Sequence, residues 1–212
     1  TAPGAAPGAA TAADTAAKDS PKFIEAVVMY TAGRYERAAT LLKLHLLRHP
    51  THYHGRILLA RALIYSGRPG EATGVLQAQH GPVPTVVVPA LTGADAQRLL
   101  AEALLLDGRF AEAEPVLESA LERNSEDPRL LVLLARVHRN AGHGEQAVSL
   151  YRQALMYRGE LGVAARELSQ VYAARGAFTA AEEWRQRAAH LLPEALLTPE
   201  ERSTDLRSEA HQ

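Results

Sequence analysis

The sequence predicts an all-α protein built from repeated helix pairs, and two observations support this prediction. Glycines recur at Gly33, Gly67, Gly108, Gly142 and Gly176, in steps of 34, 41, 34 and 34 residues. Glycine inside a helix costs about 1 kcal/mol relative to alanine, so each of these glycines marks a break between two helices. Small residues also recur at fixed distances on both sides of each break. We therefore expect about five helix-turn-helix units of about 34 residues.

The recurring small residues identify where the two helices of a pair meet. Small side chains let two helices approach closely, and larger apolar residues flank them. Five residues after the glycines stand Ala38, Ala72, Ala113, Ala147 and Ala181, and seven before them stand Ala26, Ala60, Ala101, Ala135 and Ser169. The large flanking residues are Leu59, Leu100, Leu134 and Leu168, eight before, and Leu42, Leu76, Leu117 and Tyr151, nine after. Glu25 and Arg185 depart from this apolar pattern in the first and last units.

Aromatic residues and prolines mark the turns and the ends of the units. Tyr35, Phe110 and Phe178 stand two residues after a glycine, where they are expected to pack under the turn. Pro50, Pro84 and Pro193 stand 17 residues after a glycine, where proline ends a helix.

A 34-residue unit with these small, large and closing proline positions resembles the tetratricopeptide repeat family. The resemblance covers residues 20–193 and implies a right-handed α-solenoid. Each unit would hold two helices of about 14 residues, roughly 21 Å long, which bury their apolar faces only by stacking. The first helix of each pair would line a concave groove.

Three segments lie outside the regular pattern. Residues 1–19 are nearly all Ala, Pro, Gly and Thr and predict a flexible tether. Residues 81–93 form an insertion loop, whose valines either fold onto nearby helix ends or contact a partner. Residues 194–212 predict a polar capping helix or tail, because Thr198, Pro199 and Glu201 form a helix-start signature.

Composition restricts the class of protein. The chain has 212 residues, a formal net charge of −1 and no cysteine, which excludes a global field for nucleic acid, a disulfide framework and a thiolate metal site. No apolar run reaches the roughly 18–20 residues needed to span a membrane. Because the chain starts at Thr1 and the tether is typical of segments after a cleaved leader, we expect a periplasmic or other extracytoplasmic location, with the cytoplasm as the alternative.

The sequence does not favour a catalytic or metal-binding site. His45, His49, His52 and His54 have spacings that can hold zinc or copper, but no carboxylate lies nearby in sequence to support them. The glycine clusters near Gly67 and Gly142 lack the spacing of a phosphate-binding loop. We therefore expect no enzyme activity, no cofactor and no metal, with a histidine metal-binding protein as a lesser alternative.

The resemblance implies that the groove is lined by first-helix positions ten, six and three before each glycine. The N-terminal part of this wall is apolar and aromatic, and the C-terminal part is rich in arginine. Arginine presents a planar fork to carboxylates, so the expected ligand is a protein segment with an apolar anchor and acidic residues. The predicted site residues are Phe23, Val27, Tyr30, Ile57, Arg61, Ile64, Tyr65, Arg98, Arg129, Arg136, Arg139 and Arg166.

These features favour a non-enzymatic protein–protein interaction adaptor or scaffold that binds a partner segment in its groove during assembly of a multiprotein, cell-envelope complex. The alternative is a permanent structural subunit of a larger assembly or of a homo-oligomer. A subclass of the family that clamps the carboxylate tail of chaperones is not expected, because Phe23 and Val27 occupy its Lys and Asn positions.

Overall fold

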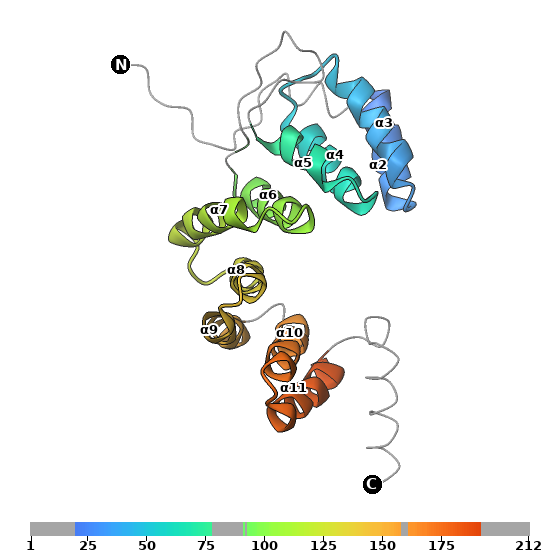
Figure 1. Ribbon diagram of the computed structural model, residues 1–212. Coiled ribbons are helices and arrows are strands. Elements are labelled where there is room, and N and C mark those ends of the chain that lie inside the picture. Colours follow the sequence, from blue (N-terminus) through green and yellow to red (C-terminus); the bar gives the residue numbers. More distant parts are fainter. Residues whose placement is uncertain (1–19, 78–90, 92, 158–160, 192–212) are drawn as a thin grey trace, which may run out of the picture. The chain divides into compact units, whose positions relative to one another are not determined.

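Helix pairs make up the whole described part of the chain. The computed structural model describes residues 20–77, 91, 93–157 and 161–191, and every regular element within these ranges is an α-helix (Figure 1). The expectations for residues 1–19, for most of the loop 81–93 and for residues 194–212 lie outside them. The helices are α2 (Pro21–Thr31), α3 (Tyr35–Leu46), α4 (Tyr53–Tyr65), α5 (Pro69–Leu76), α6 (Ala94–Leu106), α7 (Phe110–Arg123), α8 (Pro128–Asn140), α9 (Gly144–Met156), α10 (Leu161–Ala174) and α11 (Phe178–Leu191).

The five marker glycines form the turn inside each pair, as the sequence predicted. All five have a positive φ between 72° and 80°, a conformation that costs other L-residues about 1–2 kcal/mol. The residue after each glycine donates its N–H to a carbonyl five residues earlier, as from Arg34 to Met29 (2.9 Å) and from His143 to His138 (2.8 Å). This is the Schellman arrangement, in which a left-handed glycine satisfies the last carbonyl groups of a helix.

The chain divides into two compact units, Thr1–Val116 and Leu117–Gln212. In the first unit α2 packs on α3, α3 on α4, α4 on α5 and α5 on α6, so consecutive helices are neighbours (Figure 1). In the second unit α8 packs on α9, α9 on α10 and α10 on α11. The division falls within α7, which contributes its first residues to one unit and its last to the other.

Burial confirms the repeat phase. The small residues five after the glycine are fully buried in the first four pairs, as are Ala26, Ala60, Ala101 and Ala135 seven before it. Leu42, Leu76, Leu117 and Tyr151, nine after, are also fully buried. Burying a leucine side chain contributes about 1.5–3 kcal/mol, so these positions hold the pairs together.

Two details differ from the sequence expectations. Helix α5 has 8 residues and not about 14, because its backbone turns to an extended conformation at Gln77 after a stretch weakened by Gly70 and Gly74. Phe178 does not pack under its turn and is 72% exposed. It belongs to the last helix pair, and among the described residues no further pair follows to cover it.

Candidate protein-binding surfaces

The predicted apolar wall of the first unit is only partly accessible. Ile57 and Ile64 are each 9% exposed and belong to the buried core, so they support the surface from beneath. Phe23 packs on the rings of His45 and His52, with centroid distances of 5.3 and 4.8 Å. Val27 remains exposed on α2.

The most accessible part of this wall is a cluster of three tyrosines at the turn end of the first two pairs. Tyr35 stacks on Tyr65 with centroids 5.1 Å apart, and Tyr30 lies 5.5 Å from Tyr35 and 6.2 Å from Tyr65. Tyr65 is 59% exposed. Burial raises the pKa of Tyr30, the neighbouring Tyr65 adds to this, and the positive charge of Arg61 opposes it. We call Tyr30, Tyr35 and Tyr65 the tyrosine cluster.

Arg98, assigned by sequence to the arginine-rich part of the wall, lies on α6 in the first unit. Its guanidinium is 3.7 Å from Asp95 and 3.6 Å from Glu102, and its side chain is mostly buried. The two acids on the same helix therefore neutralise it locally.

Two of the four histidines, His45 and His52, form a buried pair. Nε2 of His45 and Nδ1 of His52 are 2.8 Å apart, and both side chains are buried. Burial, together with the nearby His52 and His49, lowers the pKa of His45 to about 4. Nowhere in the described ranges do three or more His, Cys, Asp or Glu side chains gather as they would around a metal ion.

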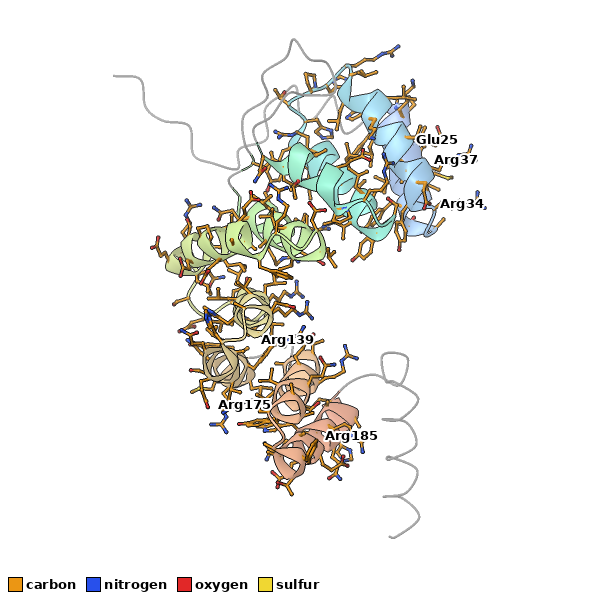
Figure 2. All side chains as sticks on the ribbon, in the orientation of Figure 1. Glu25, Arg34, Arg37, Arg139, Arg175 and Arg185 are labelled. Carbon is orange, nitrogen blue, oxygen red and sulfur yellow. The ribbon has the colours of Figure 1, made fainter. Side chains whose placement is uncertain are left out.

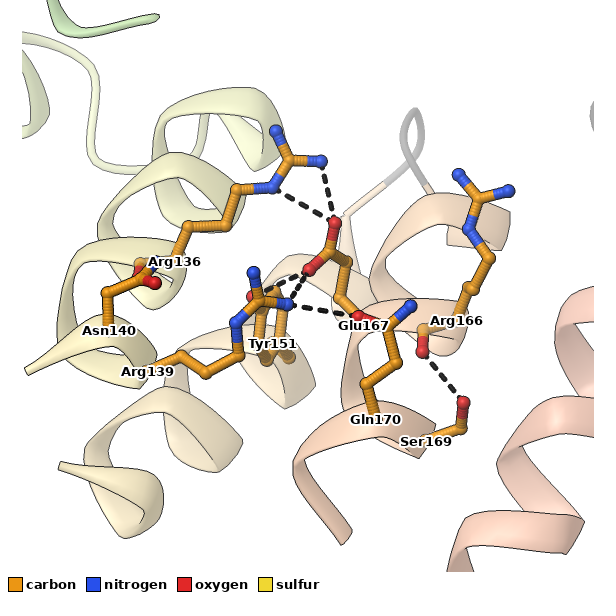
Figure 3. Close-up of polar contacts among 8 residues, drawn as sticks. All are labelled: Arg136, Arg139, Asn140, Tyr151, Arg166, Glu167, Ser169 and Gln170. Atoms are coloured by element: carbon orange, nitrogen blue, oxygen red, sulfur yellow. Dashed lines mark hydrogen bonds and ion pairs between the residues drawn. The ribbon is translucent and has the colours of Figure 1, made fainter. Parts of the chain in front are cut away.

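In the second unit, two predicted arginines converge on one buried acid. Arg136 Nε and Nη2 donate to Glu167 Oε1 at 3.1 and 2.8 Å, and Arg139 Nη1 donates to Oε2 of the same carboxylate (Figure 3). The Glu167 side chain is 11% exposed, whereas those of Arg136 and Arg139 are 32% and 31% exposed. We call these three residues the arginine–glutamate cluster. It joins α8 to α10.

Two further polar groups complete the surroundings of the arginine–glutamate cluster. Tyr151 Oη on α9 lies 3.4 Å from Glu167, and Arg139 also donates to Gln170 at 3.2 Å. Burial raises the pKa of Tyr151, and the Glu167 charge raises it further, so its hydroxyl stays protonated. Arg166 extends away from this carboxylate in Figure 3, and Arg129 lies exposed at the start of α8, so the structure does not bring these two into the cluster.

Sequence reasoning missed Glu167, Tyr151 and Gln170 as members of a site. A signal existed for Glu167, which stands nine residues before its glycine where the other four units have Ile24, Leu58, Leu99 and Leu133. A charge at an otherwise apolar, buried position needs paired partners. The two arginines of the preceding pair provide them.

No helix in the described ranges combines the length and the apolar character needed to cross a membrane.

Comparisons with known proteins agree with this architecture. A tetratricopeptide repeat model matches residues 104–157. No curated protein matches the chain significantly. Among solved structures, MamA residues 41 to the end from Desulfovibrio magneticus RS-1 has a TM-score of 0.64 at 17% identity, covering 86% of this chain and 97% of its own. TTC0263, a tetratricopeptide repeat protein of Thermus thermophilus, has a TM-score of 0.62 at 22% identity, covering 82% and 92%.

A third solved structure, YrrB, is described as a tetratricopeptide repeat protein with an unusual peptide-binding site. It has a TM-score of 0.58 at 17% identity and covers 88% of this chain and 95% of its own. The glycine turns, the buried small positions, the matched family model and these shared folds lead to one conclusion. Residues 104–157 match the tetratricopeptide repeat family, and the described helix pairs share the fold of these solved tetratricopeptide repeat structures.

Proposed function

We propose that this chain is a non-enzymatic interaction scaffold that binds a segment of a partner protein on its first-helix surfaces. The preferred segment carries an apolar anchor and acidic residues. Each unit offers one contact by itself: the tyrosine cluster of the first unit suits an apolar anchor, and the arginine–glutamate cluster of the second unit suits an acidic residue. The fold supports this class of function, since YrrB of the same fold is described as having a peptide-binding site.

The observation that carries the proposal is the geometry of the arginine–glutamate cluster. A carboxylate offers about four acceptor sites, whereas two guanidinium groups carry ten N–H donors. Glu167 therefore orients Arg136 and Arg139 without satisfying all their donors, and the three charges sum to +1. Both arginines remain about one third exposed. A partner carboxylate would meet positive charge that is already ordered, which lowers the entropic cost of binding.

The tyrosine cluster is suited to the apolar part of the ligand. Tyrosine provides a large contact area at low conformational cost, because it has two rotatable side-chain bonds. Tyr35 and Tyr65 already stack, so the exposed ring of Tyr65 is held in place. Arg98 adds little positive charge here because Asp95 and Glu102 neutralise it. Acid recognition is therefore assigned to the second unit.

A selection from peptide libraries of several lengths tests this proposal. Selected peptides should combine an aromatic or aliphatic residue with Asp or Glu. NMR shifts caused by binding should map to α2 and α4 and to α8 and α10, and affinity should fall with salt. Peptides without acids whose affinity is independent of salt would contradict the proposal.

Two substitutions refine this test. Tyr65→Ala and Arg139→Gln should each weaken peptide binding about tenfold, while Arg152→Gln on α9, an exposed arginine, should not. Neutral replacement of Arg139 is preferable to charge reversal, which would place another carboxylate beside Glu167 and disturb the fold. The fold is checked through the fluorescence of Trp184, the sole tryptophan of the chain.

The proposal includes a setting, namely assembly of a multiprotein complex outside the cytoplasm. Its support is compositional: a segment of Ala, Pro, Gly and Thr at residues 1–19, which is typical of tethers that follow a cleaved leader. Cell fractionation with an antibody to the chain tests the location, and recovery in the cytoplasmic fraction would refute this part alone.

A further inference from the structure

Three positions on each first helix form the face that docks on the preceding pair. These positions stand twelve, nine and five residues before the glycine. A Cβ added at Gly55, twelve before, would lie 2.9 Å from His52 at the start of the same helix and 3.3 Å from side-chain atoms of His45 and Leu46 on α3. Glu167, nine before, bonds to Arg136 and Arg139 on α8. The contacts with α3 and α8 point to the preceding helix pair, so we call these positions the stacking face.

The stacking face is covered in the later pairs and open in the first. In α6, α8 and α10 all three positions are buried, and in α4 two are buried and Leu58 is half-buried. In α2 the same positions hold Pro21, Ile24 and Val28, and Ile24 and Val28 are each 53% exposed. Terminal repeats usually present a polar outer face to water. Here the first stacking face has kept two large apolar residues.

Within residues 161–191, the last pair exposes part of the complementary face. Ala181 is half-buried, whereas its equivalents Ala38, Ala72, Ala113 and Ala147 are fully buried. Phe178 is exposed, whereas its equivalent Tyr35 stacks on Tyr65 of the next pair. Arg185 stands nine after its glycine, where the other four units have fully buried Leu42, Leu76, Leu117 and Tyr151. It is held by Glu182 at 2.7 Å.

The two open ends carry opposite charges at positions that meet inside the chain. Tyr151 stands nine residues after its glycine. It lies 3.4 Å from Glu167, which stands nine residues before the next glycine, and it shares a core cluster with Leu168, which stands eight before that glycine. By the same register, Arg185 would face the residues nine and eight before the glycine of a following pair. In the first pair of the chain those residues are Ile24 and Glu25. Glu25 on α2 is exposed, and Figure 2 labels it together with Arg185 on α11.

We propose that a second copy of this chain occupies these ends, with α2 of one copy stacking on the α10–α11 pair of another. By this register, Ile24 and Val28 would cover the stem of Arg185 and Ala181, Thr31 would lie over Phe178 as Tyr65 lies over Tyr35, and Glu25 would pair with the Arg185 guanidinium. The contact continues the interface that the chain already uses between its own pairs. Because its two sides differ, it is heterologous, and it adds copies until a ring closes or a filament grows. This inference is independent of peptide binding.

Multi-angle light scattering of the full chain tests the proposal. The weight-average mass of the wild type should rise with concentration over roughly 1–500 μM and should not stop at two copies. Glu25→Arg alone and Arg185→Glu alone should each weaken association about tenfold or more, because like charges would meet. Glu36→Arg on α3 and Arg187→Glu on α11 make the same charge changes away from the stacking face, and their association should match that of the wild type.

Mixing the two variants identifies the geometry. In an equimolar mixture, Glu25→Arg chains and Arg185→Glu chains present complementary ends to each other, so assembly should return with the copies alternating. Circular dichroism of each variant checks that it is folded. A wild type that remains monomeric throughout the range overturns the proposal. If Glu25→Arg abolished association and Arg185→Glu did not, two α2 faces would be in contact. If the mixture of variants did not associate, Glu25 and Arg185 would not pair. Either result also overturns the proposal.

Discussion

Replacing Glu167 by glutamine should destabilise the second unit by about 2 kcal/mol. The substitution keeps the shape of the side chain but removes the negative charge that holds Arg136 and Arg139 together. It also puts an amide N–H₂ group where a carboxylate oxygen accepts from arginine. The two guanidinium groups would then repel each other without a compensating charge between them.

The magnitude follows from the contacts and their exposure. Three arginine N–H groups donate to this carboxylate, and a hydrogen bond to a charged group contributes about 1.5–3 kcal/mol. The arginine side chains are about one third exposed, so water replaces part of each lost bond, and the remaining amide oxygen keeps another part. The expected loss therefore lies between about 3–5 kcal/mol for breaking a buried pair and less than about 1 kcal/mol for a surface pair.

Urea unfolding followed by the fluorescence of Trp184 measures this loss, because the sole tryptophan packs in the second unit. Glu145→Gln is the matched control. Glu145 also pairs with an arginine, Arg175, but its side chain is 79% exposed, so its loss should cost about 0.5 kcal/mol or less. If Glu167→Gln and Glu145→Gln lower the unfolding free energy equally, the arginine–glutamate cluster does not stabilise the unit and the reasoning fails.

Three other perturbations have defined outcomes. Gly142→Ala should lower the unfolding free energy by about 1–2 kcal/mol, because the φ of Gly142 is 80°. Gly144→Ala is the control: this glycine lies in a helix with room for a methyl group, so its replacement should be neutral or stabilising. Equal effects of the two substitutions in urea unfolding would argue against backbone strain at Gly142. Ala147→Leu should overpack the α8–α9 pair and cost about 1–3 kcal/mol, and an unchanged melting temperature would contradict the repeat phase. Lowering the pH from 6.5 to 4 should reduce the unfolding free energy by about 3 kcal/mol through His45, because its folded pKa of about 4 lies below its unfolded pKa. Neutral His45 stabilises the fold above pH 6.5, and this contribution is lost as the pH falls and the unfolded chain takes up the proton. His45→Gln should remove this slope in urea unfolding at several pH values, and a slope that persists would assign it to other groups.

The repeat architecture was predictable from the sequence because it depends on a few residue types with strict requirements. Glycine is needed for the left-handed turn, and only a small side chain fits between two close helices. These constraints recur in register, so Gly33 and Ala38 already indicate what Gly142 and Ala147 do. The register also placed Arg136 and Arg139 on one face of α8.

The pairing of those arginines was not predictable by the same route. A register states which face a residue occupies, but the partner of a charge depends on the neighbouring pair, and Glu167 lies 28 residues beyond Arg139. Likewise, Ile57 and Ile64 stand at groove positions, yet the packing of adjacent helices buries both. The short length of α5 was not predictable from the repeat, because it follows from the low helix propensity of Gly70 and Gly74, which are specific to this unit.

The turns explain how such an architecture survives extensive sequence divergence. Each turn is closed by main-chain hydrogen bonds, and a Cβ added at any of the five glycines would meet no neighbouring atom within 4 Å. One achiral residue per repeat is therefore enough to reverse the chain, and the exposed residues beside it are free to vary. Lineages that keep this single requirement and the small buried contacts can replace most other side chains, which is consistent with a common fold at 17–22% identity.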